Sequence, residues 1–459
     1  MRRIKICFPI LVVLLIFCNA LYVHAAQPVA IQEYVDKFSK ETKCDSVSVA
    51  VVNDKGVEFY GDENGLYQIG SMTKAFTGLA IQKLISEGSL NESDSVSELL
   101  PGFVALYNSE PVEITVEQLL MQTSGYTNKE KDYPSATEDM SLADWVDSIS
   151  GKDLQSKPGE KYAYSNVTYN LLGAIIENTT GKSYEDYMYE EILLPLGLTN
   201  TYVGIPEDKT IISGARLGYR QAFEYDISVY EGRIPAGYFY SNTTDMARWI
   251  NIWLGTADIP DEYNELINTV KNRLGQTSDY YYGWELFEND VIGHSGGTPN
   301  YSSRIVFSEK ENIGVCVLTN MNVAASTDAL CNGLFSIAEG KDVSKIASDV
   351  WTIFDILFTA LSALAILMII VVLLIKKRGV VIGIGAFALI LLTTICILMP
   401  AIFGAGLREI AFIWAPYSFA GGLLFLSVNI PVAIIKYLVF GNNENRKKAC
   451  RRQTPNSYN

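Results

Sequence analysis

Three long uncharged runs in the last third of the chain place the tightest limit on what it can fold into. They cover residues 357–375, 379–407 and 410–435. Each is long enough for a helix to cross the hydrocarbon core of a bilayer, which is about 30 Å thick. One such run alone could be a buried core helix, but three in succession predict three transmembrane helices within residues 351–440.

Basic residues beside these runs predict their orientation. A basic cluster at 376–378 separates the first two runs, and a second cluster follows the third, whereas only Arg408 lies between the second and third runs. Basic residues are enriched on the cytoplasmic side of membrane spans. The pattern therefore predicts a multi-pass protein of the cell membrane, with residues 441–459 as a basic cytoplasmic tail and residues 27–345 as an extracytoplasmic domain.

The first residues of the chain indicate export as well. Three basic residues among the first five precede an apolar run at 6–23, which ends at the small residues Ala25 and Ala26. This order is typical of a secretory signal peptide, predicted here for residues 1–26. The alternative is an uncleaved N-terminal anchor.

The composition of residues 27–345 excludes some classes of function. This part holds 47 Asp and Glu against 23 Lys and Arg, a net charge of −24. Nucleic-acid binding needs a basic surface, so no nucleic-acid partner is expected. The whole chain has only two histidines, and the three cysteines of this part lack metal-ligand spacing. A zinc hydrolase is therefore not expected, and no metal or other cofactor is predicted.

Strand patterns occur at both ends of this domain and helical patterns occur between them. Residues 46–52 and 57–60 read as a β-hairpin. Further strands are expected at 281–287, 291–294, 301–307 and 313–318, and helices at 32–39, 115–122, 141–148, 167–179, 183–194, 244–254 and 324–338. The predicted fold class is α+β, an α/β sandwich in which helices flank one antiparallel sheet and a mostly helical lobe is inserted. A cleft between the two parts is the expected binding site.

Ser71 and Lys74 form the first candidate catalytic pair. They stand one helical turn apart at the start of a segment with helix-forming residues and an apolar period. Both side chains therefore lie on one face, where a partly buried amine can take the proton of a hydroxyl. The pair occurs by chance in long chains, and alone it is equally compatible with an ordinary helix that carries an exposed lysine.

Two later stretches contain further chemistry-bearing side chains. Tyr164 and Asn166 flank one residue on a polar turn, and both can point into one cavity. His294, Gly296 and Gly297 lie in a glycine-rich stretch where another group can approach the strand backbone closely. The alternatives are a tyrosine-rich surface turn with an N-capping asparagine, and a histidine in an ordinary turn.

Taken together, the three motifs resemble those of a known superfamily. Ser-x-x-Lys, Tyr-x-Asn and His-x-Gly, in this order and spacing, look like the signature of serine β-lactamases and penicillin-binding proteins, in the class C β-lactamase-like branch with its DD-peptidases and esterases. The segments 114–125, 194–198, 245–249 and 314–320 are also similar to that branch. The resemblance covers about residues 30–340 and does not include the membrane runs.

The resemblance implies a β-lactamase/DD-peptidase-like fold and a role for each motif residue. Ser71 would be acylated, with Lys74 and Tyr164 moving its proton as a coupled pair. Asn166 would hold the substrate amide, and His294, Gly296 and Gly297 would line the substrate site. The N–H groups of Ser71 and Gly297 would form an oxyanion hole.

One motif departs from the classical members of the superfamily. Where those have Lys-Thr-Gly, this chain has His294, Ser295 and Gly296. A histidine is mostly neutral at pH 7, so the grip on a substrate carboxylate is expected to be weaker. Arg304 is a candidate replacement for the missing charge, and the alternative is a surface strand residue.

These observations predict a membrane-anchored extracytoplasmic serine hydrolase that acts through an acyl-enzyme. The expected substrate is a small peptide, amide or ester, with D-alanyl groups of the cell wall as one candidate. The alternative is a sensor that captures a wall peptide or a β-lactam, does not turn it over, and signals through its membrane helices.

Overall fold

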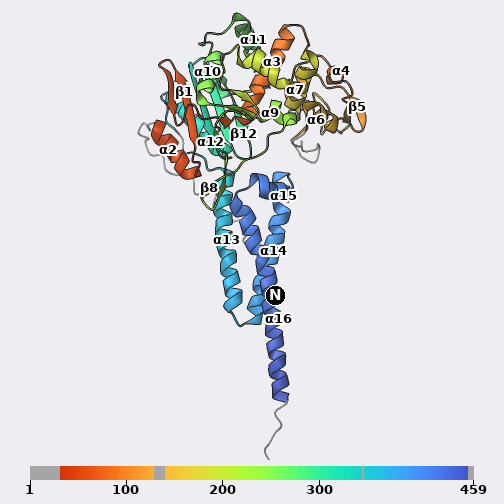
Figure 1. Cartoon of the computed structure of the whole chain (residues 1–459), viewed down its shortest axis with the longest axis vertical. Coiled ribbons are helices and arrows are strands. Elements are labelled where there is room, and N and C mark those ends of the chain that lie inside the picture. Colours follow the sequence, from red (N-terminus) through yellow and green to blue (C-terminus); the bar gives the residue numbers. More distant parts are fainter. Residues whose placement is uncertain (1–30, 129–139, 344–345, 453–459) are drawn as a thin grey trace, which may run out of the picture.

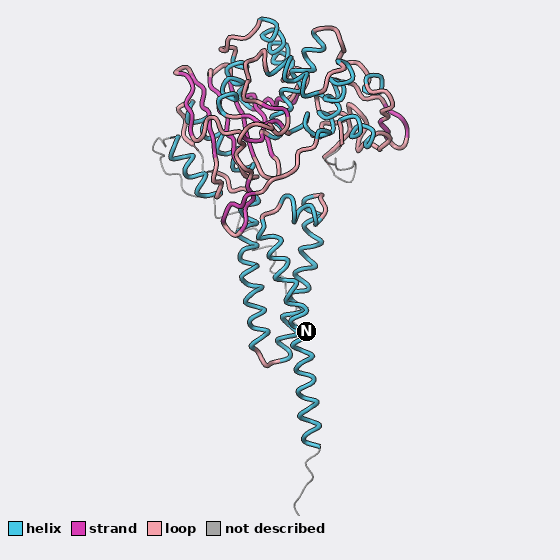
Figure 2. Tube along the Cα trace, in the orientation of Figure 1, coloured by secondary structure: helices cyan, strands magenta, loops and turns pink. Residues whose placement is uncertain are grey.

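A computed structural model describes residues 31–128, 140–343 and 346–452, so the predicted signal peptide lies outside the described residues. A globular part formed by residues up to 343 stands on one end of a bundle of three long helices (Figure 1). Strands and short helices are mixed throughout the globular part, whereas the bundle is wholly helical apart from its connections (Figure 2).

A seven-stranded antiparallel sheet forms the centre of the globular part. The order across the sheet is β10-β11-β12-β13-β14-β1-β2. The strands are β1 Val47–Asn53, β2 Gly56–Tyr60, β10 Tyr280–Tyr281, β11 Trp284–Phe287, β12 Val291–Gly297, β13 Ser302–Ser308 and β14 Ile313–Thr319. Strand β1 pairs with both β2 and β14. The first hairpin and the last strands of the domain therefore share one sheet, which confirms the predicted fold class.

Helices cover both faces of this sheet. Since successive strand residues point to opposite sides, each strand contributes side chains to both cores. Val49 and Val51 pack in the core beneath helices α2 Ile31–Thr42 and α12 Ala324–Ala338. Ala50 and Val52 face the larger core on the other side, to which α3 Thr73–Ser86 and α10 Thr243–Leu254 contribute. The sheet is thus the middle layer of an α/β sandwich.

The helical lobe lies between β2 and β10 in the sequence. Its remaining helices are α4 Val96–Leu99, α5 Val116–Leu120, α6 Leu142–Ile149, α7 Asn166–Thr180, α8 Tyr184–Met188, α9 Ile234–Gly237 and α11 Asp261–Arg273. Its short strands are β3 Tyr67–Gln68, β4 Ala105–Tyr107, β5 Glu110–Val112, β6 Tyr202–Val203, β7 Ala215–Gly218, β8 Gln221–Glu224 and β9 Phe239–Ser241. Helix α11 was not predicted from the sequence pattern.

Two predicted elements are divided in the structure. The expected strand at 281–287 is broken by a turn at Tyr282 and Gly283, both with positive φ, which separates β10 from β11. The expected helix at 183–194 consists of α8 followed by a π-helical turn, Tyr189–Leu193. Hydrophobic pattern alone did not show either break.

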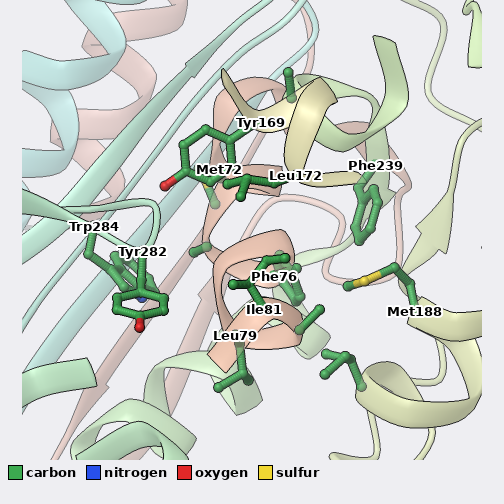
Figure 3. Packing of buried hydrophobic residues seen from close by; sticks show 14 of the residues in the cluster. Met72, Phe76, Leu79, Ile81, Tyr169, Leu172, Met188, Phe239, Tyr282 and Trp284 are labelled. Carbon is green, nitrogen blue, oxygen red and sulfur yellow. The ribbon is translucent and has the colours of Figure 1, made fainter. Parts of the chain in front are cut away.

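Helix α3 is buried on nearly every side, and this fixes the position of its N-terminal end. All its residues from Thr73 to Leu84 are buried. Phe76 stacks on Trp249 with ring centroids 4.3 Å apart, and Phe239 lies beside it (Figure 3). A helix that is apolar all round belongs to a core, where packing and not amphipathicity determines its placement.

The three long C-terminal helices are α13 Val350–Leu374, α14 Arg378–Phe403 and α16 Tyr417–Arg452. Val350–Leu374, Arg378–Phe403 and Tyr417–Val439 are long and apolar enough to cross a membrane. The expected third run began at 410, but residues before Tyr417 form the short helix α15 Leu407–Glu409 and a π-helical turn, Ile410–Trp414. Pro416 explains this break, because the residue before a proline is pushed out of helical conformation.

The aromatic stack around α3 predicts a large loss of stability on truncation. Phe76→Ala removes a fully buried ring, which should lower the free energy of unfolding by about 3–5 kcal/mol. Chemical unfolding of the full chain in detergent measures this loss. Leu194→Ala is the control, because Leu194 is 52% exposed and its truncation should change stability by less than about 0.5 kcal/mol. Equal effects of the two substitutions would contradict the assignment of Phe76 to the core.

Candidate active site

The backbone at Ser71 is held against the end of β12. Ser71 lies in a single 3₁₀ turn, Gly70–Met72, that leads directly into α3. Gly70 has φ +53°, and a Cβ atom there would lie 2.6 Å from the amide nitrogen of Gly297. Only glycine allows this approach, since such a contact is shorter than real Cβ contacts. The turn that carries Ser71 therefore touches the strand that carries Gly297.

The side chain of Lys74 joins three elements in the buried part of the site. Its Nζ lies 3.0 Å from Ser71 Oγ, 2.7 Å from Asn166 Oδ1 and 2.5 Å from the carbonyl oxygen of Ala236. The side chain is fully buried. None of the ion pairs found among the described residues includes it. The amine is thus surrounded by neutral groups.

Burial lowers the pKa of Lys74 well below its ordinary value. The charged amine would donate to all three oxygens, whereas the neutral amine, which a lowered pKa favours, has two N–H groups and one lone pair. In the neutral form the lone pair must make one of the three contacts. Carbonyl oxygens only accept hydrogen bonds, so the two N–H groups point to Asn166 and Ala236. The lone pair is left for the O–H of Ser71. This arrangement suits proton transfer from the hydroxyl to the amine.

Tyr164 lies beside this pair. Its ring centroid is 4.9 Å from Lys74 Nζ. Burial raises the pKa of the Tyr164 phenol, and the neighbouring Ser71 hydroxyl offsets part of the rise. The phenol is therefore protonated at neutral pH, and it can give a proton to a group that leaves from an acyl centre next to Ser71.

A network of polar contacts holds the second motif in place. Ser165 caps α7 by accepting the N–H of Val167, so Asn166 is the first residue of the helix and not its cap. The N–H of Ser165 donates to Gln122 Oε1 at 2.9 Å. The N–H of Asn166 donates to Asn128 Oδ1 at 2.7 Å. Gln122 and Asn128, which precede α6 in the chain, thus hold the backbone of the second motif in place.

His294 is buried and lies close to Tyr164, with ring centroids 6.1 Å apart. Burial, with smaller contributions from Lys74 and Arg304, lowers the pKa of His294 to about 3. Its Nδ1 lies 2.6 Å from the carbonyl oxygen of Ser295, which can only accept, so the proton of the neutral ring is on Nδ1. The ring adds no positive charge to the site at neutral pH.

The two glycines of the third motif have different surroundings. A Cβ at Gly296 would lie 2.1 Å from the carbonyl oxygen of Ile69, so this position requires glycine. A Cβ at Gly297 would meet nothing within 4 Å, and Gly297 is exposed. Open space thus lies beside Gly297, whose amide nitrogen is next to Gly70 of the Ser71 turn. An oxyanion hole formed by Ser71 and Gly297 stays a prediction that this geometry permits.

Arg304 does not supply a free charge to the cleft. Its guanidinium donates to Ser295 Oγ at 2.5 Å and to Asn332 Oδ1 at 3.1 Å, and it lies 3.7 Å from Asp328. The residue is only 8% exposed, so it is not a surface strand residue either. The nearby carboxylate of Asp328 partly balances its charge, and Ser295 and Asn332 accept from two of its nitrogens, so the Arg304 cation is already paired.

Sequence reasoning missed three contributors to the site. Ala236 acts through its backbone carbonyl, which leaves no signal in the type of side chain. Gln122 lies inside the segment 114–125 that resembled the family, but only the fold shows its contact with Ser165. Tyr280, whose hydroxyl is 3.4 Å from His294 Nε2, could not be distinguished among 27 tyrosines.

Comparison with known proteins gives a consistent picture. The family model described as Beta-lactamase matches residues 31–334. Protein flp of Staphylococcus aureus (strain MRSA252) is 36% identical over 318 residues, which cover 65% of this chain and 62% of that protein. Penicillin-binding protein 4* of Bacillus subtilis (strain 168) is 29% identical over 272 residues, covering 53% of this chain and 58% of the relative. The chain thus spans less than two thirds of these relatives.

Solved structures share the fold of the globular part. An octameric penicillin-binding protein homologue from Pyrococcus abyssi superposes with a TM-score of 0.58 and 25% identity, covering 69% of this chain and 78% of that chain. A class C beta-lactamase superposes with a TM-score of 0.56 and 18% identity, covering 71% of this chain and all of the other. At that identity the second likeness shows the fold alone.

The lowered pKa of His294 predicts how stability depends on pH. Between its ordinary pKa of 6.5 and the folded value of about 3, only the unfolded chain binds the proton, so stability falls with decreasing pH by about 1.4 kcal/mol per unit from this group. His294→Gln should therefore lose less stability than the parent between pH 7 and 4.5.

Chemical unfolding of the full chain at the two pH values measures that difference. Tyr280→Phe is the matched control, because it removes the contact to Nε2 but keeps the titrating ring. The control should show the pH dependence of the parent. An identical slope in the His294→Gln variant would contradict a neutral buried ring.

Proposed function

We propose that this chain, which belongs to the Beta-lactamase family, is a membrane-anchored serine hydrolase that acts through an acyl-enzyme on a peptide, amide or ester. The observation that carries the proposal is the buried amine of Lys74, 3.0 Å from Ser71 Oγ and without a carboxylate partner among the described residues. A neutral amine in this position can accept the serine proton without help from a second base.

Acylation would then proceed as follows. The Ser71 hydroxyl gives its proton to Lys74 Nζ while Oγ bonds to the carbonyl carbon of the substrate. The negative charge that develops on the carbonyl oxygen is stabilised by the N–H groups of Ser71 and Gly297. The leaving amine or alcohol departs with a proton that comes from Lys74 through the phenol of Tyr164. Water then cleaves the ester on Ser71 by the reverse proton path.

Lys74 and Tyr164 are best treated as one proton-carrying unit. The Lys74 amine lies 4.9 Å from the centroid of the Tyr164 ring. Both the amine and the phenol neighbour the Ser71 hydroxyl. Two coupled groups titrate as a pair, so a bell-shaped rate profile reports the pair and not one residue. Asn166, which binds Lys74 and lies at the exposed rim, would hold the substrate amide.

The charge of the site narrows the substrate class. Among the described residues of the third motif and its neighbours, His294 is neutral and Arg304 is paired with Asp328, so neither offers an unpaired cation to a substrate carboxylate. Substrates whose scissile group carries no adjacent carboxylate, such as aminoacyl esters or capped peptides, fit this site better than penicillins. D-alanyl groups of the cell wall belong to this class where they are esterified or amidated.

We further propose that the globular part is extracytoplasmic and tethered by α13, α14 and α16. The basic residues at 376–378 and the basic residues after the third helix support this orientation. A reaction on cell-wall material requires the globular part to lie on this extracytoplasmic side of the membrane.

A sensor is the second candidate, and one observation favours it. The bundle does more than tether, since buried polar contacts such as those of Arg216 with Ala411, Phe412 and Ala415 bind it to the globular part. A signalling protein would need such a connection. A sensor would acylate once and stay acylated, whereas an enzyme releases the acyl group and turns over again.

Labelling of the nucleophile tests the proposal. The full chain in detergent is exposed to a serine-directed phosphonate, and separately to a penicillin, followed by intact-mass analysis. The phosphonate should add one adduct that Ser71→Ala abolishes, and the penicillin should react much more slowly. No adduct with either reagent would overturn the acyl-enzyme mechanism.

Turnover of an uncharged aminoacyl ester distinguishes the enzyme from the sensor. The full chain should release many equivalents of alcohol per protein, with Ser71→Ala as the inactive control. Lys74→Met should lower kcat by about 10³-fold or more, because the nucleophile loses its base. A single-equivalent burst followed by a stable acyl-protein would favour the sensor.

A further inference from the structure

The β7–β8 hairpin is the part of the globular domain that enters the top of the helical bundle (Figure 1). It connects at its tip and along β7 to α13, α16 and the residues between α14 and α16. Those residues, 404–416, are called the connector below. The interface is polar and buried, which is unlike a flexible tether.

Arg216 on β7 is the main contact of the hairpin with the connector. The residue is 4% exposed, and its guanidinium donates to the carbonyl oxygens of Ala411, Phe412 and Ala415. It also lies over the rings of Tyr225 and Tyr417, at 5.2 and 4.6 Å. No carboxylate pairs with Arg216 among the described residues, so these carbonyls at the end of a helical turn are what stabilises its charge.

The tip of the hairpin is fixed to α13 and α16. The N–H of Arg220 donates to Asp355 Oδ2 at 2.8 Å, and Asp355 is fully buried and also accepts the hydroxyl of Ser418 at 2.7 Å. The Tyr219 ring covers Gly421 of α16, where an added Cβ would lie 1.8 Å from the Tyr219 hydroxyl. A side chain at position 421 therefore requires the Tyr219 side chain to leave its contact with α16.

The other end of the hairpin is bonded to the turn that follows the third motif. Tyr225 accepts from Asn300 Nδ2 at 2.8 Å through its carbonyl oxygen, and its N–H donates to Gly214. Asn300 Oδ1 in turn accepts from Thr298 Oγ1 at 3.2 Å. Thr298 directly follows Gly297. Hydrogen bonds from Tyr225 to Phe412, from Asn300 to Tyr225 and from Thr298 to Asn300 thus join the connector to the residue that follows Gly297.

We propose that the membrane bundle positions the oxyanion hole through the β7–β8 hairpin, with Arg216 and Asn300 as positioning residues. This rests on the proposed function of Gly297. The competent enzyme is then the full chain, and a change confined to a membrane helix alters the reaction at Ser71. An oxyanion hole acts mainly in the transition state, so loss of its geometry lowers kcat more than it raises KM.

Gly421→Leu in the full chain, reconstituted in detergent micelles, tests the proposal without changing the globular part. The new side chain displaces the Tyr219 side chain from α16 and so removes one contact of the hairpin tip with the bundle. Gly383→Leu is the matched control, since the same addition in α14 meets nothing within 4 Å. Arg216→Gln is a second variant that breaks the same connection from the globular side.

Two readouts are measured for each variant: hydrogen–deuterium exchange of a peptide covering 297–303, and steady-state turnover of an uncharged ester. Gly421→Leu and Arg216→Gln should raise exchange at Thr298 and Tyr301, and should lower kcat by about tenfold with KM changed less than about twofold. The control should match the parent in both.

Faster exchange without a fall in kcat in an active parent would overturn the proposal, as would unchanged exchange in both variants. If the parent itself neither labels at Ser71 nor turns over, the proposed function fails. Faster exchange in that case would still establish the mechanical link from the bundle to Gly297, because exchange does not depend on activity.

Discussion

The site depends on an amine that is buried without an opposite charge. Lys74 is fully buried, and its contacts are a hydroxyl, a side-chain amide oxygen and a backbone carbonyl oxygen. A buried amine next to a carboxylate would keep its proton and could not act as a base. Neutral surroundings lower its pKa and leave its lone pair for Ser71. The rest of the fold serves to keep these neutral partners in place.

Three separate parts of the chain supply those partners, and the core holds them in register. The 3₁₀ turn Gly70–Met72 provides Ser71, and α3, which follows it and is buried on nearly every side, provides Lys74. Helix α7 provides Asn166 through a cap at Ser165, and α9 provides the carbonyl of Ala236. Strand β12 closes the site, because Gly70 and Gly296 let the backbones touch. The packing of helices against the sheet thus sets the surroundings, and with them the pKa, of the Lys74 amine.

Much of this arrangement was predictable from the sequence, for identifiable reasons. Ser71 and Lys74 are one helical turn apart, so local periodicity alone places them together. Residues 46–52 alternate, and the stretches after 290 are rich in strand-forming residues. Ala236 contributes only its backbone carbonyl oxygen, so the type of its side chain does not predict its role. The hairpin β7–β8 docks through Arg216 onto carbonyl oxygens, and no pattern of residues predicts such a contact. The third helix that is long and apolar enough to cross a membrane begins at Tyr417 because Pro416 breaks an otherwise apolar run.

The pH dependence of Ser71 phosphonylation tests the central claim most directly. The second-order rate constant for a neutral phosphonate is measured across pH with the full chain in detergent, and Tyr164→Phe is measured in parallel to separate the phenol from the amine. The account predicts that the rate rises with pH to a plateau whose midpoint lies well below 10.5, the ordinary pKa of a lysine. A midpoint at or above 10.5 would mean that Lys74 is charged in the resting site and would contradict the account.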